Sequence, residues 1–542
     1  MAVREYRLSR NQPREAAAEI QGEIDNVRQA WAWAAHQGRL PTLAATLAAL
    51  YRFYGFTGVV VEGEQSLHLA AECIRSRAAP QTVEAQHLLS TVLALRAHLL
   101  VLYASHPQVI PLAQEAIALG EASGAIVGQA MGYYTWGYAL ARQSRCSEAR
   151  ACAEQALQLA QQHQRTLDDS SAPFELLYEV EWVAYYLLSN LHYVENDYPG
   201  AIAYVTKGLH RCQTLGKLQG ESLCLLQLAE LLKKVNDSAA ARLYGERALH
   251  SARALGYRWV EAASQLQLST VARLLGEYTL ADAYGQGAIT LFRTTGAHAL
   301  VAAAAALLGQ LHSYLGNADH ADEWFDEFGR QIEGLAIPDD EVEMEGLLPA
   351  ALHCHHYGNH LQALAYADKA WQIAHRNRWP RGQAHALLVR GHALSALQWS
   401  DEASEAYGQA LVLCHSLGNP HFAVEVRAGL AGVALAQGDL SLAQSHVEAI
   451  LTVLADHPLA GLDEPFFAYL TCYRVLAVHH DPRTAHLLQK GYDLLQVYAS
   501  RIGDDSQRRS FLDNIAVHCD LQQAYATWSL STGYSDKRFR VR

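Results

Sequence analysis

Apolar and small residues recur at helical spacing along most of the chain, and short polar or glycine-containing breaks interrupt them at regular distances. The stretch 188–209, LSNLHYVENDYPGAIAYVTKGL, shows this unit, with two apolar-faced segments on either side of the turn Asn196-Asp197-Tyr198. Such a pattern predicts two antiparallel helices joined by a tight connection. Ala201 falls where the second helix must pass closest to the first, because a bulky side chain there would hold the two backbones apart.

The same hairpin pattern repeats at a step of 40 residues, once of 42, in three columns of mostly small residues. The column that contains Ala201 continues as Ala241, Ala281, Ala321, Ala363, Ala403 and Ala443. Twelve residues earlier lie Ser189, Ala229, Ser269, Gly309, Ala351, Gly391 and Ala431. Seven residues later lie Gly208, Ala248, Gly287 followed by Ala288, Phe328, Ala370, Ala410 and Ile450. Turn pairs between the first two columns include Gly276-Glu277, Gly316-Asn317, Gly358-Asn359 and Gly438-Asp439. A period of this length predicts a solenoid, in which each hairpin buries its apolar face against its neighbours.

These columns resemble the tetratricopeptide repeat (TPR), and seven copies in register carry the resemblance. It implies an all-α fold, a right-handed α-solenoid or superhelix of TPR-like helical hairpins. The period exceeds the roughly 34 residues of the usual repeat, so each hairpin gains about 9 Å of helix at 1.5 Å per residue. We expect about nine to eleven hairpins, with atypical ones at the ends.

The register of the columns divides the chain into expected parts. Residues 41–173 should form irregular N-terminal helical repeats with a polar loop near 163–173, residues 174–456 a regular TPR-like array, and residues 457–542 a C-terminal repeat, capping helices and a tail. Within the array, the stretch 330–346 breaks the apolar period, and its residues 338–345 include five acidic side chains. They are expected to form a solvated loop, and a docking site for a basic partner is the alternative.

The first part, residues 1–40, contains the run EIDNVRQAWAWA at 23–34. Trp31, Ala34 and Ala30 can share one helical face, which predicts a first core helix with an acidic start. The run is also similar to the junction in bacterial STAND proteins (signal-transduction ATPases with numerous domains) of the LuxR or maltose-activator type. There, an ATPase and winged-helix module hands over to helical repeats, so the resemblance implies an upstream NTPase module. No Gly-x-x-x-x-Gly-Lys-Ser/Thr phosphate loop occurs in this sequence, so the chain is either a sensor region separated from its ATPase or a protein that works without one.

The composition and charge of the chain exclude several other classes of protein. The formal net charge is −13 and the only basic run is 537–542, so we expect no nucleic acid to bind this chain. The longest apolar run, 299–308, is far shorter than the roughly 20 residues of a membrane-spanning helix, and the first twenty residues lack the apolar core of a signal peptide. Nine cysteines without a Cys-x-x-Cys pair predict reduced thiols. We therefore expect a cytoplasmic protein that does not bind membranes.

Nothing in the sequence has the spacing of a known catalytic site, and we expect neither an enzyme nor a cofactor. The strongest candidate for metal chemistry is His353, His356 and His360, spaced i,i+3 and i,i+4 as on one face of a helix. The turn Gly358-Asn359 falls between the last two, however, and the chain contains 27 histidines. Structural histidines are therefore the favoured interpretation over a metal site or a metal-dependent enzyme.

The TPR resemblance implies that the first helix of each hairpin lines a concave groove. Its matching positions here are Tyr134, Tyr138, Arg142, Tyr186, Asn190, Tyr193, Glu230, Lys233, Lys234, Arg273, Gln310, Ser313, Tyr314, His355, His356, His392 and Ser395. Tyrosines crowd the N-terminal half of this set, and aromatic rings with a polar tip often anchor interfaces. Asn190 stands where such repeats often hold a peptide backbone. We expect a groove-bound peptide or protein, with a small effector and a hydrated surface without ligand as alternatives.

These observations favour a non-catalytic sensor region of a STAND-type ATPase, in which a groove ligand controls oligomerisation and signalling. The alternative is a stand-alone TPR scaffold that assembles protein complexes. The sequence leaves the identity of the ligand open, because periodicity reports the scaffold and not the details of its surface.

Overall fold

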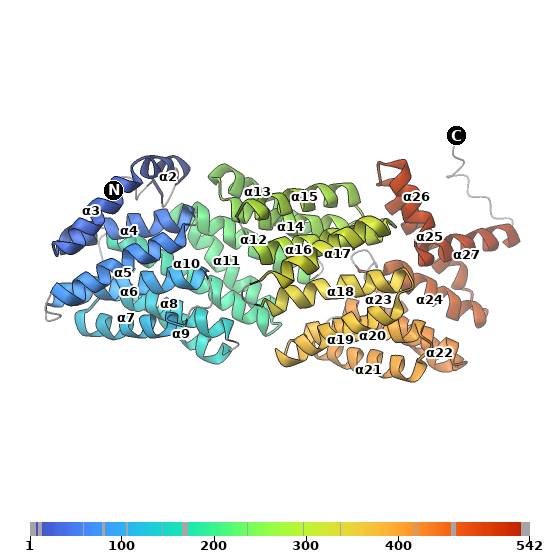
Figure 1. Ribbon diagram of the computed structural model, residues 1–542. Helices are drawn as coiled ribbons and strands as arrows, with labels where there is room; N and C mark the ends of the chain where they lie inside the picture. Colours follow the sequence, from blue (N-terminus) through green and yellow to red (C-terminus); the bar gives the residue numbers. More distant parts are fainter. Residues whose placement is uncertain are drawn as a thin grey trace. The chain divides into compact units, whose positions relative to one another are not determined.

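The computed structural model describes residues 7–8, 13–57, 59–77, 82–103, 107–143, 145–164, 172–235, 237–295, 297–335, 338–417, 420–456 and 462–532. Within these ranges the chain forms 26 helices and no strands (Figure 1). The chain divides into two compact units, Met1–Ser264 and Gln265–Arg542, and the boundary falls inside α14. That boundary lies within the stretch 174–456, which the sequence columns treat as one array. Most of the polar loop expected at 163–173, and the tail from 533, lie outside the described residues.

Unit 1 contains α2 (Pro13–Gln21), α3 (Ile24–His36), α4 (Leu40–Thr57), α5 (Val60–Arg77), α6 (Val83–Tyr103), α7 (Val109–Ser123), α8 (Ile126–Arg142), α9 (Cys146–Gln164), α10 (Ala172–Val194), α11 (Tyr198–Leu215), α12 (Leu218–Lys234), α13 (Ser238–Leu255) and the first turns of α14 (Arg258–Leu274). Unit 2 contains the rest of α14, then α15 (Tyr278–Thr295), α16 (His298–Tyr314), α17 (Ala318–Glu333), α18 (Asp340–His356), α19 (His360–Arg376), α20 (Pro380–Ala396), α21 (Ser400–Ser416), α22 (Pro420–Ala436), α23 (Leu440–Asp456), α24 (Pro465–Val478), α25 (Thr484–Ser500), α26 (Asp505–Asp513) and α27 (Ala516–Thr532).

Successive helices pair as antiparallel hairpins, from α6 with α7 to α12 with α13 in unit 1 and from α16 with α17 to α24 with α25 in unit 2 (Figure 1). The first helices of neighbouring hairpins also pack against one another, as α6, α8, α10 and α12 do in unit 1 and α16, α18, α20, α22 and α24 in unit 2. The second helices pack mainly on the first helices that flank them. Each unit is therefore a stack of hairpins with an inner layer of first helices, which confirms the predicted all-α solenoid.

The alanine column lies where two helices of a hairpin cross. All seven alanines, from Ala201 to Ala443, are at most 1% exposed near the start of the second helix. The small residue twelve positions earlier faces them from the first helix. In two hairpins it is a serine whose hydroxyl donates to the alanine carbonyl, from Ser189 to Ala201 at 2.8 Å and from Ser269 to Ala281 at 2.6 Å. The close helix approach predicted from the sequence is confirmed.

The turn inside each hairpin needs one residue in the left-handed region. Gly276, Gly316, Gly358 and Gly438 supply it with φ between 71° and 84°, and all four belong to the predicted turn pairs. Asn196 and Gln398 take the same place with φ of 62°. Because side chains with a Cβ rarely adopt this conformation, the turns explain the recurrent glycines.

The first core helix exists as α3, but its buried face differs from the prediction. Trp31 is 5% exposed and its indole nitrogen donates to the Ser66 carbonyl at 2.9 Å. Ala34 and Ala35 are buried, whereas Ala30 is exposed. The prediction for Ala30 was wrong, because the helices that pack on α3, mainly α5 and α4, leave Ala30 on its exposed side.

Most described residues of the stretch 330–346 are helical, because α17 ends at Glu333 and α18 begins at Asp340. The expected loop was therefore too long, and its acidic residues from Asp340 onward belong to a helix. Asp339 accepts a hydrogen bond from the Val342 amide at 3.2 Å and caps α18, whose first turns hold the remaining acidic residues. Asp340 pairs with Arg376 at 2.8 Å, and Glu343 pairs with Lys369 at 2.6 Å. Negative charge at a helix N-terminus is favourable, and these partners on α19 neutralise it, which explains an acidic helix start inside the array.

The C-terminal part contains the predicted hairpin and the closing helices. α24 and α25 pack as a pair across the turn that includes Asp481, and α26 and α27 follow. Phe511 of α26 is fully buried, with its ring 5.5 Å from that of Tyr278 and 6.3 Å from that of Phe466. The described helices include none that is long and apolar enough to cross a membrane.

Candidate functional site

The positions expected to line a groove do lie on the first helices of the hairpins. In unit 1 they belong to α8, α10 and α12, which pack side by side as the inner layer. Arg142 is exposed at the end of α8, and Tyr134 is buried at 5% exposure. The other positions of unit 1 are half-buried, namely Tyr138, Tyr186, Asn190, Tyr193, Glu230, Lys233 and Lys234. We call these seven residues, together with Gln227, the inner surface of unit 1.

Aromatic rings form a row that leads from α4 to this surface. The Tyr51 hydroxyl lies 2.6 Å from His98 Nδ1, the His98 ring is 5.5 Å from that of Tyr134, and the Tyr134 ring is 6.2 Å from that of Tyr138. Burial lowers the pKa of His98 to about 4 and raises the pKa of Tyr134. The row is therefore uncharged near neutral pH. Tyr51 and His98 were not predicted, because they lie in the irregular part of the sequence.

The Tyr51–His98 bond gives a direct test of this buried row. Replacing Tyr51 with phenylalanine removes the only hydroxyl bonded to His98 Nδ1 among the described residues. An unpaired buried polar group costs about 1–3 kcal/mol, and we expect a loss of that size in the free energy of unfolding measured by urea denaturation. Tyr133→Phe is the control, because that half-buried hydroxyl has no hydrogen-bond partner among the described residues. Equal stability of the two variants would contradict the expectation.

An amide pair lies at the centre of the inner surface of unit 1. Gln227 of α12 donates from Nε2 to Asn190 Oδ1 of α10 at 2.6 Å. Gln227 is 7% exposed, and its Oε1 accepts no hydrogen bond within the described chain. Tyr186 lies one turn before Asn190, and burial raises its pKa while a hydrogen bond from Asn190 opposes the rise. The buried Gln227 therefore fixes the Asn190 side chain, and the half-buried Asn190 amide lies beside aromatic rings.

Cations flank the amide pair at the end of α12. Glu230 lies 2.6 Å from Lys233 Nζ and 3.3 Å from Lys234 Nζ. Burial would raise the pKa of Glu230, but the two ammonium groups hold it at about 2. Lys234 also lies 5.8 Å from the centre of the Tyr193 ring. The two ammonium groups and the carboxylate form a compact charged cluster at this end of the surface.

Helix α4 covers another portion of the inner layer of unit 1. Its Arg52 pairs with Glu179 at 3.5 Å, and the same carboxylate lies 3.6 Å from Lys217 Nζ and accepts from the Trp182 indole at 3.0 Å. Phe56 lies 6.4 Å from Tyr257 between ring centres. The groove expected from the repeat resemblance is therefore partly filled by an N-terminal helix.

In unit 2 the corresponding positions lie beneath another stretch of the same chain. Arg273 and His392 are at most 7% exposed, Ser313 is buried, and Gln310, Tyr314, His355, His356 and Ser395 are half-buried. The stretch that lies against several of them is 462–467, which includes the first turn of α24. Sequence columns could not reveal this contact, because it joins residues about 190 positions apart.

The histidine candidate for a metal site does not converge in the structure. His353 binds Ser313 from Nδ1 at 3.1 Å and Asp322 from Nε2 at 2.9 Å, whereas His356 faces Glu464 at 3.3 Å. The ring of His360 lies 5.3 Å from that of His355. Within the described residues no group of histidine, cysteine and acidic side chains is arranged to hold a metal ion.

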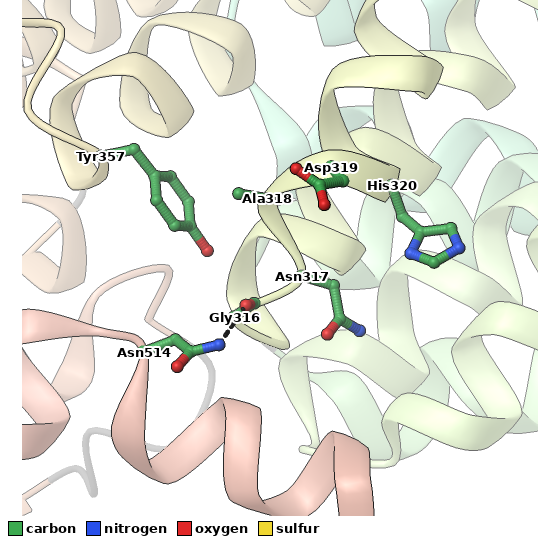
Figure 2. Close-up of a pocket in the computed structure, with 7 residues that line it drawn as sticks. All are labelled: Gly316, Asn317, Ala318, Asp319, His320, Tyr357 and Asn514. Carbon is green, nitrogen blue, oxygen red and sulfur yellow. Dashed lines mark hydrogen bonds between the residues drawn. The ribbon is translucent and has the colours of Figure 1, made fainter.

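One open cleft in unit 2 is lined by none of the residues predicted to bind a ligand or a metal. It has a volume of about 480 Å³ and is lined by the α16–α17 turn from Gly316 to His320, by Tyr357 and by Asn514 (Figure 2). Asn514 donates to the Gly316 carbonyl at 2.9 Å, as the figure shows. A Cβ on Gly316 would lie 2.3 Å from the Ser510 carbonyl oxygen. The cleft thus marks the place where the end of α26 docks on a hairpin turn.

Comparison with known proteins identifies solved structures with a similar fold. No protein-family model matches the sequence, and no protein of curated function matches it. A Rap protein complexed with competence and sporulation factor matches with a TM-score of 0.54 and 15% identity, over 70% of this chain and 99% of that one. The apo quorum sensor NprR from B. thuringiensis (TM-score 0.46, 13% identity, 67% and 97% covered) and the APC/C hetero-tetramer Cut9-Hcn1 (0.37, 16%, 88% and 98%) are more distant in shape. The likeness to the Rap protein shows a TPR-like helical repeat fold.

Proposed function

We propose that this chain is a non-catalytic binding protein that holds a peptide or protein segment on the inner surface of unit 1. The observation that carries the proposal is the amide pair of Asn190 and Gln227, placed between aromatic rings and two lysines. An extended peptide presents alternating N–H and C=O groups, and amide side chains match both. Asn190 is half-buried and can donate to a peptide carbonyl, while the buried Gln227 amide holds the Asn190 side chain in place.

The surroundings of the amide pair suit such a ligand. Tyr138, Tyr186 and Tyr193 are half-buried, so a ligand would bury the rest of each ring at little cost in side-chain entropy. The ammonium groups of Lys233 and Lys234 are half-buried donors, and an acidic residue or a terminal carboxylate of a ligand could approach them. The structure of a Rap protein with competence and sporulation factor gives an example of a complex on a similar fold.

A sensor region of a STAND-type ATPase is the biological setting that we favour. The run EIDNVRQAWAWA at 23–34 supports it, and this run forms much of α3 in unit 1. Ligand binding would then bias the helical array between arrangements and control oligomerisation of the ATPase. This setting requires that the isolated chain bind no ATP. Isothermal titration with Mg-ATP tests it, and measurable nucleotide affinity would favour a different role.

Selection from a random twelve-residue peptide library displayed on phage tests the binding proposal. Selected peptides would be synthesised with fluorescein and titrated with the chain. We expect Asn190→Ala and Gln227→Ala each to weaken binding by about tenfold, since a lost hydrogen bond in a desolvated site costs about 1–2 kcal/mol. Lys233→Met should weaken peptides that carry an acidic residue and leave neutral ones unchanged.

The matched control is Leu243→Ala, which truncates an exposed apolar side chain on the second helix α13. It should leave the affinity of the selected peptides unchanged, while Tyr186→Ala lowers it. Circular dichroism would confirm that each variant stays helical. Peptides that bind all variants with equal affinity would overturn the proposed site, and a library that yields no binder above background would overturn peptide recognition by this surface.

A further inference from the structure

The inner layer of unit 2 ends in a buried polar cluster to which five successive first helices contribute. Its members are Arg273 of α14, Tyr314 of α16, His356 of α18, His392 of α20 and Glu425 of α22. Arg273, His392 and Glu425 are between 3% and 7% exposed. Hairpin packing alone needs small and apolar residues at such places, so this cluster calls for a different explanation.

Residues 462–467 bind to this cluster through charge. Asp463 Oδ1 lies 2.8 Å from Arg273 Nη2, and Glu464 Oε1 lies 3.3 Å from His356 Nε2. The Glu464 amide donates to Glu425 Oε1 at 3.1 Å. Arg273 is also held over the Tyr314 ring, 5.2 Å from its centre. The cluster thus recognises two adjacent carboxylates and the backbone between them.

Aromatic contacts complete the recognition. Pro465 starts α24, and Phe466 packs edge-on against His518 and Tyr498, at 4.7 Å and 5.6 Å between ring centres. Phe467 packs edge-on against His392 at 5.1 Å. The segment therefore has the features of a linear recognition motif, with acidic residues first, then a proline and two aromatic anchors.

Residues 462–467 do not provide hydrogen-bond partners for all the polar atoms that they bury. Among the described residues, Arg273 Nε and His356 Nδ1 are buried and have no hydrogen-bond partner. Each such group costs about 1–3 kcal/mol, and a buried ion pair adds little net stability beyond an apolar contact of the same shape. A ligand with an additional acceptor near Arg273 could accept the hydrogen bond from Arg273 Nε that residues 462–467 leave unformed.

We propose that this inner surface of unit 2 is a binding site for an acidic segment of a partner protein, with two adjacent carboxylates followed by aromatic residues, and that residues 462–467 occupy it until the partner displaces them. The site is separate from the inner surface of unit 1, and it does not depend on the function proposed there. Other contacts keep the C-terminal helices in place, because Tyr498 donates to the Leu274 carbonyl at 3.3 Å and Asn514 to that of Gly316 at 2.9 Å.

The test uses the full chain and a fluorescein-labelled peptide of sequence AGLDEPFFAYL, which copies residues 460–470. An internal occupant lowers the apparent affinity by the fraction of chains in which the site is open. The double variant Asp463→Asn/Glu464→Gln weakens the occupant, so it should bind the peptide about tenfold or more tightly than the wild type in fluorescence anisotropy. Adding Arg273→Met to this variant should abolish binding, and a peptide with amides in place of its two carboxylates should not bind.

The control is Asp401→Asn/Glu402→Gln, which changes an exposed Asp-Glu pair at the start of α21. It should bind the peptide like the wild type, and so should Asn190→Ala in unit 1, which separates this site from the one proposed above. Hydrogen exchange of the wild type adds a readout that needs no variant: excess peptide should accelerate exchange in 462–478. Unchanged exchange there, or equal affinity of the wild type and the double variant, would overturn the proposal.

Discussion

Replacing Tyr407 with alanine should lower the free energy of unfolding by about 3–5 kcal/mol, as for other fully buried aromatic side chains. Tyr407 lies on α21 and is 1% exposed. Its ring lies between two glycines on neighbouring first helices, since a Cβ on Gly391 or Gly429 would come within 2.5 Å of ring atoms. Its hydroxyl lies 2.8 Å from His392 Nδ1. Truncation would leave a cavity between two hairpins and an unpaired buried imidazole.

A substitution at Gly391 of α20 provides a second test of the same packing. In the wild type, Gly391→Ala should destabilise, because the new methyl group would collide with the Tyr407 ring. In the Tyr407→Ala variant the space is empty, and the same substitution should stabilise by up to about 1 kcal/mol, the difference in helix propensity between alanine and glycine. Urea denaturation of the four proteins forms a double-mutant cycle. The same sign of the Gly391→Ala effect in both backgrounds would contradict the packing described here.

Replacing Glu425 with glutamine should make the stability of the chain less sensitive to alkaline pH. Burial and the neighbouring Asp463 raise the pKa of Glu425 to about 8. A carboxyl group with a raised pKa stabilises the fold below its unfolded pKa of about 4.3, and this contribution is lost as the pH rises through the folded value. Ionisation of Glu425 should therefore lower the free energy of unfolding of the wild type, relative to that of the variant, by on the order of 2–5 kcal/mol between about pH 4.5 and pH 8.

Other titratable groups that face this region are present in both proteins. They are Asp463, Glu464, His356, His385, His392 and His518, with Arg273 and Arg381 nearby. Burial lowers the pKa of His392 and of His518 to about 4, so these two destabilise the fold as the pH falls below about 6.5. The contribution of these two histidines cancels in the difference between the free energies of unfolding of the wild type and the variant, provided that the substitution leaves the surroundings of the histidines unchanged.

Thermal unfolding followed by circular dichroism at a series of pH values measures that difference. Glu425→Gln should match the wild type near pH 4.5 and unfold at a higher temperature near pH 8, because the glutamine oxygen can still accept from the Glu464 amide. Glu402→Gln on α21 is the control, since that side chain is exposed. A constant offset between Glu425→Gln and the wild type at all pH values would show that Glu425 is ionised in the folded chain.

The sequence was sufficient to predict the helical hairpins, their register and the glycine-containing turns, because these follow from local spacing and from steric limits on small residues. The alanine column and the serine bond at Ala201 are direct examples. The acidic start of α18 was misassigned, because its partners Arg376 and Lys369 lie on the next helix and a run of charges resembles a loop when read alone.

The candidate sites were predicted only in part. Asn190 and its neighbours were identified from their place in the repeat, whereas Gln227 was missed because it lies one turn before the expected positions of α12. The contact of Tyr51 with His98, which lies beside Tyr134, and the contact of Arg273 with Asp463 join segments far apart in the chain. Periodicity carries no information about such contacts, so the sequence predicted an open groove where the structure has a partly filled one.

The segment 462–467 touches the first helices of consecutive hairpins through Arg273, His356, His392 and Glu425. Repeat arrays usually gain or lose whole hairpins at little cost, since each hairpin depends only on its neighbours. Here an inserted or deleted hairpin between α14 and α22 would move some of these side chains one repeat away from their partners on the segment. The segment thus fixes the number of hairpins that this portion of unit 2 can contain.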